Sequence, residues 1–384
     1  MKKLISIVLL CSACLDPYLP PASSTNLDAL VVDGLIDVNG TASVILSRSI
    51  PLDGKNPPEK ETGAVVTIES SDGEKLLLNE DAAGSYSLNG ITVDRNSKYT
   101  LHIVTAEDKD YRSDPVSIHN TPPVDSIYWT VSASGKLDIR ADSHNTDPNS
   151  TGYYLLNAIE TYEYHADINA HFKFVNRQPV ERLPEEEVYY CYSNERTPNV
   201  IASTKGLTED RLSGVKITTI ERSSPKISMR YSILVKQFAI GDDEFNYQKL
   251  LQASTEQQAS LYAQIPGRVT GNVHSTKDPD EYVLGYFSGR NVKELRYFID
   301  FFDLPSGFYQ RPVSYCQAEP TCFLPGLNLP QPGGCVDPFA LSESVGIVTV
   351  VKDGAGNPTS YIFATAECTD CTLKGGTTIK PPFW

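Results

Sequence analysis

The most constraining feature of the sequence is a series of short segments, beginning at Leu30, in which apolar and polar residues alternate. The segments LVVDGLIDV and ASVILSRS flank Asn39-Gly40, the dipeptide type that most strongly signals a two-strand hairpin. The stretch GAVVTIESSDG alternates in the same way, as expected of strands with one face buried and the other in water. The first third of the chain therefore folds as β-strands joined by tight turns.

The spacing of these segments predicts a β-sandwich at residues 28–121, resembling the immunoglobulin or transthyretin-like group, because several short strands follow one another with turn signals between them. Thr121-Pro122-Pro123 ends this unit, since neither proline can donate to a strand ladder. Residues 122–384 are expected to form a larger β-rich domain with one main helix at 242–262, whose first turn carries three acidic residues. The fold class is mainly β, with a cysteine-rich, irregular C-terminal region.

The N-terminus reads MKKLISIVLLCSAC, a positive pair of lysines, a short apolar run and small residues before Cys14. This run is too short to span a bilayer and indicates a secretory signal at residues 1–13. A cysteine after small residues predicts a lipoprotein, in which Cys14 carries acyl chains such as palmitate and residues 14–27 form a tether. Cys11 is the competing lipid site, although bulky Leu10 precedes it, and an ordinary secretory peptide is the alternative.

The chain has 48 acidic and 33 basic residues and a net charge of −15. Such a charge opposes binding to nucleic acid, so we expect no nucleic-acid partner. After the leader, no apolar stretch of the sequence reaches the length of about 20 residues that a membrane-spanning helix requires.

The remaining cysteines are even in number, which in an exported chain predicts disulfides. The candidates are Cys191, Cys316, Cys322, Cys335, Cys368 and Cys371. Six cysteines allow about 15 pairings, and the sequence does not select among them. The C-x-x-C formed by Cys368 and Cys371 would also suit a zinc knuckle or a dithiol redox centre. The spacing between Cys316 and Cys322 is loose for zinc, however, and no thioredoxin-like βαβ context surrounds the C-x-x-C.

No motif of an enzyme stands out. The sequence lacks a G-x-S-x-G elbow, a P-loop, a Rossmann glycine fingerprint and an HExxH pair. Asp142-Ser143-His144 combines triad residue types, but a triad is assembled from separated elements, and the run Asp142–Asp147 fits a calcium loop only in part. We therefore expect no catalytic residues, no metal site and no cofactor. A group of tyrosines between 153 and 192 suits either a sandwich core or a protein interface.

The ending AECTDCTLKGGTTIKPPFW places the C-x-x-C before a Gly-Gly turn and a closing Phe-Trp pair. We expect the glycines to turn the chain back and Phe383 and Trp384 to pack against the body as a structural clasp.

Several of these stretches together resemble a known family. LVVDGLIDVNGTASVILSRS, RYSILVKQFAI, GNVHSTKDPDEYVLGYFS and ECTDCTLKGGTTIKPPFW are similar to surface lipoproteins of Bacteroidota-type bacteria known as domain of unknown function 4249. The resemblance covers nearly the whole chain after the leader. It implies a lipid-anchored protein of the outer membrane, often encoded beside a TonB-dependent receptor, with no established enzyme activity.

The leading functional hypothesis is a non-enzymatic surface lipoprotein that serves a TonB-dependent β-barrel transporter as an accessory or capture subunit. The first alternative is a stand-alone adhesin or glycan-binding lipoprotein that uses loops of the first sandwich. The second is a secreted hydrolase whose site is assembled from residues that carry no motif.

Overall fold

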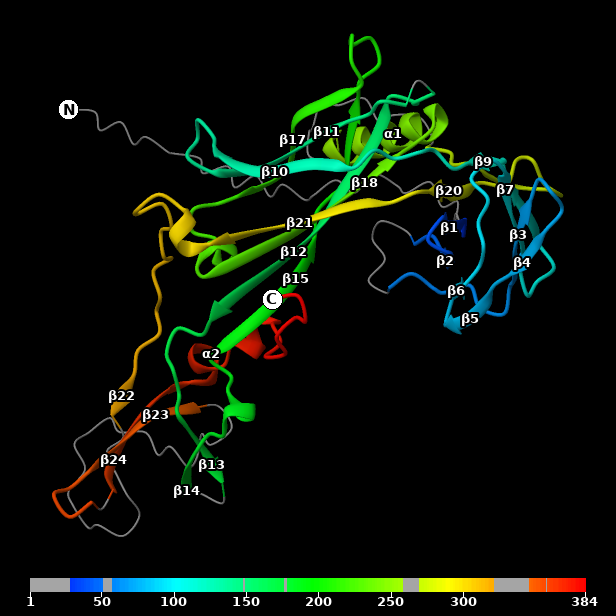
Figure 1. Cartoon of the computed structure of the whole chain (residues 1–384). Coiled ribbons are helices and arrows are strands. Elements are labelled where there is room, and N and C mark those ends of the chain that lie inside the picture. Colours follow the sequence, from blue (N-terminus) through cyan, green and yellow to red (C-terminus); the bar gives the residue numbers. More distant parts are fainter. Residues whose placement is uncertain are drawn as a thin grey trace, which may run out of the picture.

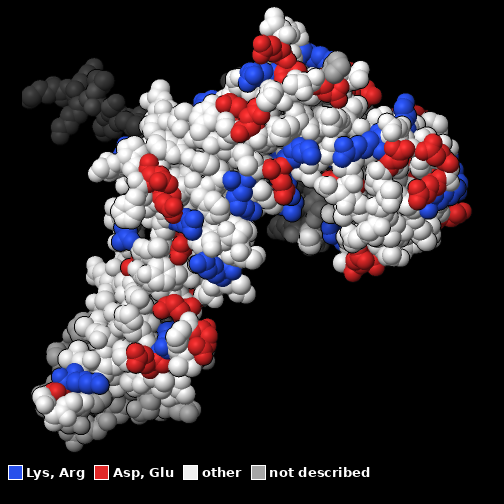
Figure 2. Space-filling model, viewed as in Figure 1, with Lys and Arg blue, Asp and Glu red and all other residues white. Residues whose placement is uncertain are grey.

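The structure is a computed structural model that describes residues 28–50, 57–147, 149–175, 178–257, 269–320, 345–356 and 358–384. The described chain is mainly β, as predicted, and forms three regions along an elongated, bent molecule (Figure 1). A first sandwich lies at one end, a pair of longer sheets occupies the centre, and a small sheet projects at the other end. On the face in view, the described basic and acidic side chains are interspersed (Figure 2).

The first sandwich has two sheets that share one buried core. The first sheet has the strand order β20-β1-β2-β6-β5, and the second has the order β19-β8-β7-β3-β4 with β9 beside β7. The bounds are β1 Leu30–Asp37, β2 Thr41–Arg48, β3 Val65–Ser70, β4 Lys75–Leu77, β5 Asn79–Ala82, β6 Ser85–Asn89, β7 Lys98–Val104, β8 Asp110–Ser113, β9 Val116–Ser117, β19 Val273–Ser275 and β20 Val283–Arg290. Alternate residues of β1, β2 and β7 are buried, so the sequence alternation corresponds to the observed faces.

The predicted turn at Asn39-Gly40 joins β1 to β2. Gly40 has a φ of 88°, a conformation that glycine adopts without strain, and the Asn39 N–H donates to the Asp37 carboxylate at 2.7 Å. The antiparallel register runs from Leu30 opposite Arg48 to Asp37 opposite Thr41. The hairpin signal therefore located this connection correctly.

Two strands of the first sandwich come from the second half of the chain, outside residues 28–121. Strand β20 pairs in parallel with β1, from Leu30 opposite Val283 to Asp37 opposite Arg290, and β19 pairs with β8. A glycine permits the close approach of β20 to β1. Gly285 has a φ of 99°, and a Cβ atom there would lie 1.8 Å from the Val32 carbonyl oxygen. Parallel pairing between such distant segments leaves no local signal in the sequence.

The central region is a second, larger pair of sheets around its own core. One sheet has the order β10-β11-β17, and the other has the order β15-β12-β18-β21 with β16 also on β12. The bounds are β10 Val124–Val131, β11 Leu137–His144, β12 Tyr153–His165, β15 Tyr190–Arg196, β16 Val200–Ser203, β17 Arg211–Ile220, β18 Arg230–Ala239 and β21 Lys293–Asp300. Residues of both sheets, such as Ile139, Tyr154 and Ile233, meet in one buried cluster.

The main helix, α1, spans Asp242–Gln257 and begins where the sequence predicted. The predicted last residues, 258–262, lie outside the described residues. Phe245 of α1 stacks on Tyr153 with ring centroids 4.5 Å apart. The buried Glu244 carboxylate accepts from Arg290 at 2.7 Å and from Ser288 at 2.8 Å, so the helix links the central region to β20. None of the helices in the described ranges is both long and apolar enough to cross a membrane.

The third region is a sheet of order β14-β13-β23-β24-β22 that projects away from the first sandwich (Figure 1). Its bounds are β13 Phe172–Val175, β14 Gln178–Glu181, β22 Glu319–Pro320, β23 Val345–Lys352 and β24 Pro358–Thr365. The short helices of the chain are α2 Ala366–Thr369 and the 3-10 turns η1 Pro184–Glu186, η2 Pro225–Ile227, η3 Phe301–Asp303 and η4 Cys371–Lys374. After β24, the chain turns back through α2 and η4 onto the central region.

Candidate functional site

Two disulfides fasten the C-terminal segment to the central region. Cys371 of η4 is bonded to Cys191 of β15, and Cys368 of α2 is bonded to Cys316. The prediction of disulfides is thus confirmed, and the two cysteines of the C-x-x-C bond to different segments rather than to each other. Because the thiolate is the form that binds zinc, these bonded sulfurs are not zinc ligands. The candidate disulfide residues Cys322 and Cys335 and the lipidation candidate Cys14 lie outside the described residues.

Trp384 packs as the predicted clasp, whereas Phe383 is 38% exposed and contacts the guanidinium of Arg296 with its ring. Thr377 and Tyr192 exchange backbone hydrogen bonds of 2.7 and 2.9 Å. The Trp384 ring meets Tyr192 edge-on at 5.5 Å, lies under the guanidinium of Arg230 and donates from Nε1 to Glu163 at 3.3 Å. The turn that brings the chain back lies at Gly375, where φ is 86°.

Residues 309–318, which we call the strap, run in an extended course from η3 to β22 along the central region (Figure 1). Arg222 holds the beginning of the strap: its carbonyl accepts from the Gln310 N–H at 2.9 Å, and its guanidinium donates to the carbonyls of Gly307 and Phe308 at 2.8 Å each. The Cys316–Cys368 disulfide holds the other end. The strap is therefore fixed at two points about six residues apart, which limits its conformational freedom.

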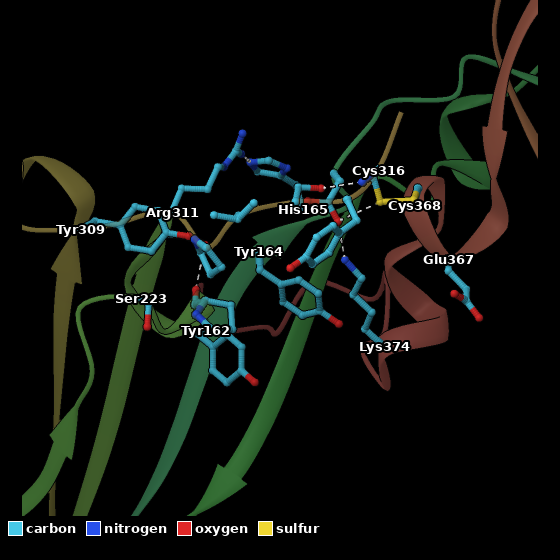
Figure 3. Close-up of a pocket in the computed structure, with 17 residues that line it drawn as sticks. Tyr162, Tyr164, His165, Ser223, Tyr309, Arg311, Cys316, Glu367, Cys368 and Lys374 are labelled. Atoms are coloured by element: carbon cyan, nitrogen blue, oxygen red, sulfur yellow. Dashed lines mark hydrogen bonds and ion pairs between the residues drawn. A yellow bond between two sulfur atoms is a disulfide. The ribbon is translucent and has the colours of Figure 1, made fainter. Parts of the chain in front are cut away.

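A cavity of about 670 Å³ lies beneath the strap, between the end of β12, the turn around η2 and the α2–η4 segment (Figure 3). Its volume is within the range of about 300–1,000 Å³ that is usual for small-molecule sites. Four tyrosines, three serines, two cations, two carboxylates and one histidine are among its lining residues. The four tyrosines are Tyr162, Tyr164, Tyr309 and Tyr315.

His165, at the end of β12, has hydrogen-bonding partners at both ring nitrogens. Arg311 Nη2 lies 2.9 Å from His165 Nε2, and His165 Nδ1 lies 2.5 Å from the Ala166 carbonyl oxygen. Arginine only donates and a carbonyl only accepts, so this arrangement assigns the proton to Nδ1. The imidazole also stacks on Tyr189, with centroids 4.9 Å apart. The ring is therefore held in one orientation and one tautomer.

Asp167 follows His165 and accepts from Lys374 Nζ at 2.8 Å. Burial raises the pKa of Asp167. The hydrogen bonds from Lys374 and Ser314 and the charges of Lys374 and Arg311 lower this pKa by more than burial raises it, so it lies below its usual range. Asp167 is consequently an ionised acceptor that connects η4 to the strap.

A partly buried charged network lies beside the cavity and is joined to it through Tyr162. Lys226 of η2 donates to Glu160 at 2.7 Å and contacts Glu195 at 2.8 Å. Tyr231 donates to Glu160 at 2.8 Å, and Tyr162 donates to Glu195 at 2.7 Å. Burial and the bond to Glu195 raise the pKa of Tyr162 to about 12. Burial lowers the pKa of Lys226, but the two carboxylates raise it more, so Lys226 stays charged.

A second, smaller cavity of about 250 Å³ lies between the first sandwich and α1. His119, Asp114, Asp243 and Glu244 are among its lining residues. Burial lowers the pKa of His119, and the charge of Glu244 opposes this shift. Within the described ranges, no three or more His, Cys, Asp or Glu residues are placed so that they could hold a metal ion.

The tyrosine group that the sequence singled out is divided between the core and the larger cavity. Tyr154, Tyr162, Tyr164 and Tyr192 are buried, whereas Tyr190 is exposed. The alternation in β12 could have identified Tyr154, Tyr162 and Tyr164, whereas Tyr192 belongs to β15. No local sequence pattern marks Arg311, Asp167 and Lys374 as cavity residues, because they lie in loops and a short 3-10 turn and meet only through the disulfide-linked tail.

Three solved structures that are similar to part of the chain have low TM-scores. A two-domain fibronectin type III segment of chicken tenascin is 12% identical, covers 55% of this chain and 89% of its own, and has a TM-score of 0.15. The FN1–FN3 domains of chicken CNTN1 are 13% identical, cover 56% of this chain and 62% of theirs, and have a TM-score of 0.20. Alpha-2-macroglobulin of Escherichia coli is 12% identical, covers 56% of this chain and 19% of its own, and has a TM-score of 0.18.

No curated protein matches the chain. A family model described as a domain of unknown function matches residues 16–296, well over half of the 384 residues. The match covers the first sandwich, including its late strands β19 and β20, and the central sheets except the second half of β21. The chain therefore belongs to the family described as Domain of unknown function (DUF4249).

Proposed function

We propose that this protein is a non-enzymatic surface lipoprotein, anchored in the outer membrane through Cys14, that captures a ligand for a TonB-dependent β-barrel transporter. The proposal combines the leader sequence with the strap-covered cavity. The anchor would place the cavity beside the transporter, and the tether at residues 14–27 would raise the effective concentration of the protein at its membrane partner.

The observation that carries the proposal is that the polar groups deepest in the cavity are already engaged. Both ring nitrogens of His165 have partners, Asp167 is ionised and paired with Lys374, and the Tyr162 and Tyr164 hydroxyls are hydrogen-bonded. A general acid or base must be free to exchange a proton with the substrate. Groups fixed in this way instead form a rigid surface, which favours binding because little conformational freedom is lost when a ligand enters.

The test of the anchor and the partner is affinity purification of the tagged full-length protein from membranes in mild detergent. We expect a β-barrel transporter to co-purify with the wild-type chain and with the matched control Cys11→Ser. We expect Cys14→Ser to lose both the lipid and most of the barrel. Recovery of the chain without any barrel, although it carries its lipid, would contradict the transporter role. Binding of glycans by the first sandwich would then favour the stand-alone adhesin.

A further inference from the structure

We infer that the cavity binds a short peptide in an extended conformation, paired antiparallel to the strap, with its amino terminus at Glu367 and its carboxylate at Arg311. This inference deepens the capture role proposed above and rests on it for the site, but not for the transporter partner. It is carried by the backbone of the strap, by the direction of the strap and by the position of two charges.

The strap presents unpaired backbone. Within the described part of the chain, the N–H groups of Val313, Ser314 and Tyr315 donate to no other residue. Because the strap is held at both ends, its backbone is ordered before a ligand arrives. An extended, ordered segment with free donors and acceptors is what an added peptide strand requires, and main-chain hydrogen bonds then supply affinity.

The side chains of the strap alternate as they do in a strand. Val313 and Tyr315 are 81% and 93% exposed, whereas Ser314 between them bonds inward to Asp167 and Cys316 is fastened to α2. Alternate side chains of a strand point to opposite faces, so the backbone edge between the faces is available for pairing. The cavity, with Tyr162, Tyr164 and Tyr309, lies on the inward side and has room for apolar side chains of the peptide.

Two charges mark the ends of the cavity. Arg311 lies near the beginning of the strap, and Glu367 adjoins Cys368, which is bonded to the strap at Cys316. The two residues lie toward opposite ends of the view in Figure 3. Among the described residues, Glu367 forms neither a hydrogen bond nor a salt bridge. Arg311 is hydrogen-bonded to His165 and Tyr309 and its charge acts on Asp167, but within the same described ranges it forms no salt bridge. Glu367 and the remaining N–H groups of the Arg311 guanidinium can therefore pair with charges on a ligand.

These positions define a direction for the peptide. A peptide amine at Glu367 and a peptide carboxylate at Arg311 place the peptide antiparallel to the strap. Antiparallel pairing is slightly more stable per residue than parallel pairing, so the backbone and the charges favour the same orientation. The arginine fork also suits a carboxylate, to which it can donate two parallel hydrogen bonds. A sugar would use the tyrosines and serines but would not use two opposite charges at the two ends.

The experiment is calorimetric titration of the full-length chain in detergent with synthetic pentapeptides. Each peptide has the pattern threonine-valine-X-valine-threonine, where X is alanine, leucine, phenylalanine or tyrosine. We expect at least one peptide to bind, and acetylation of its amino terminus or amidation of its carboxylate to weaken binding about fivefold each, the usual effect of losing a partly exposed ion pair. N-methylation at alternate residues should weaken binding by a similar factor, because it removes main-chain donors.

Two variants test which side chain binds each terminus of the peptide. In Glu367→Gln, acetylation should have no further effect, and in Arg311→Gln, amidation should have none. The control variants Glu209→Gln and Arg95→Gln, at exposed sites away from the cavity, should behave as the wild type. Equal affinity for capped and uncapped peptides would overturn the assignment of the termini. Failure of the whole panel, or saturable binding of maltohexaose or cellohexaose in its place, would overturn the peptide inference.

These outcomes are independent of the transporter role. If a barrel co-purifies but no peptide binds, only the ligand class is wrong. If peptides bind as expected but no barrel is recovered, the ligand class is correct and the transporter role is wrong.

Discussion

Replacement of Gly285 by alanine is the sharpest test of the way the first sandwich is closed. The added Cβ would lie 1.8 Å from the Val32 carbonyl oxygen and 2.6 and 2.8 Å from the Val32 carbonyl carbon and nitrogen. These are backbone atoms of β1, which lies between β2 and β20 and has little freedom to move. The positive φ of 99° adds strain of about 1–2 kcal/mol for any residue with a side chain.

The magnitude follows from comparison with Gly73, which provides a matched control. Gly73 has a φ of 92°, but a Cβ there would meet no atom within 4 Å. Gly73→Ala should therefore cost only the conformational strain of about 1–2 kcal/mol. Gly285→Ala should cost that amount and also the displacement of β20 from β1, so we expect a total of more than about 3 kcal/mol, in the range of severe core overpacking.

The assay is urea unfolding of both variants and the wild type, with hydrogen exchange of β1 amides as a local measure. We expect Gly285→Ala to reduce protection of β1 strongly and Gly73→Ala to leave it nearly unchanged. Equal losses of stability in the two variants would refute the close parallel pairing of β20 with β1.

The remaining predictions concern the central region. Trp384→Ala should lower the unfolding free energy by about 2–3 kcal/mol, because a packed aromatic ring is lost, whereas Trp384→Phe should cost less; equal thermal midpoints for wild type and Trp384→Ala would show that the clasp is not structural. Lys226→Met should cost about 3–5 kcal/mol because it leaves the buried Glu160 carboxylate without its cationic partner, with only the Tyr231 hydrogen bond, while Lys236→Met at a half-exposed pair should cost less than about 1 kcal/mol; urea unfolding distinguishes the two. Asp167 has a lower pKa in the folded than in the unfolded state, so its stabilising effect is complete above the ordinary aspartate pKa of about 3.9 and is lost as the pH falls through the folded value. The difference in stability between wild type and Asp167→Asn should therefore be constant near neutral pH and shrink below about pH 4, and a difference that grows on acidification would contradict this sign.

Much of the fold could be read from local patterns. The hairpin at Gly40, the start of α1 at Asp242 and the late hairpin of β23 and β24 follow from turn chemistry, helix capping charges and alternation. Each of these signals lies within a few residues of the structure that it specifies. The clasp at Trp384 was also accessible, because an aromatic pair after a glycine turn has few other places to pack.

The rest depends on contacts between distant segments. The membership of β20 in the first sandwich is set by parallel pairing, which needs no turn and leaves no periodic mark. The cavity requires Arg311, Asp167 and Lys374 to meet, and the two disulfides that bring them together belong to the many pairings that six cysteines permit. The cysteine content predicted that disulfides exist, but not that one of them holds the strap over the tyrosine-lined cavity.

Because β20 lies far after β1 in the sequence, the first sandwich is incomplete during most of the synthesis of the chain. Ribosomes make a chain from its N-terminus at about 5–20 residues per second, so β1 precedes its parallel neighbour β20, about 250 residues away, by roughly 12–50 s. During this interval β1 is an open sheet edge, which is the kind of surface that recruits other chains. A product that ends before Val283 lacks all of β20 and would keep that edge permanently, so the first sandwich is complete only when the chain extends through β20. Truncated molecules should for this reason be cleared or aggregate, even though most of their first sandwich is present.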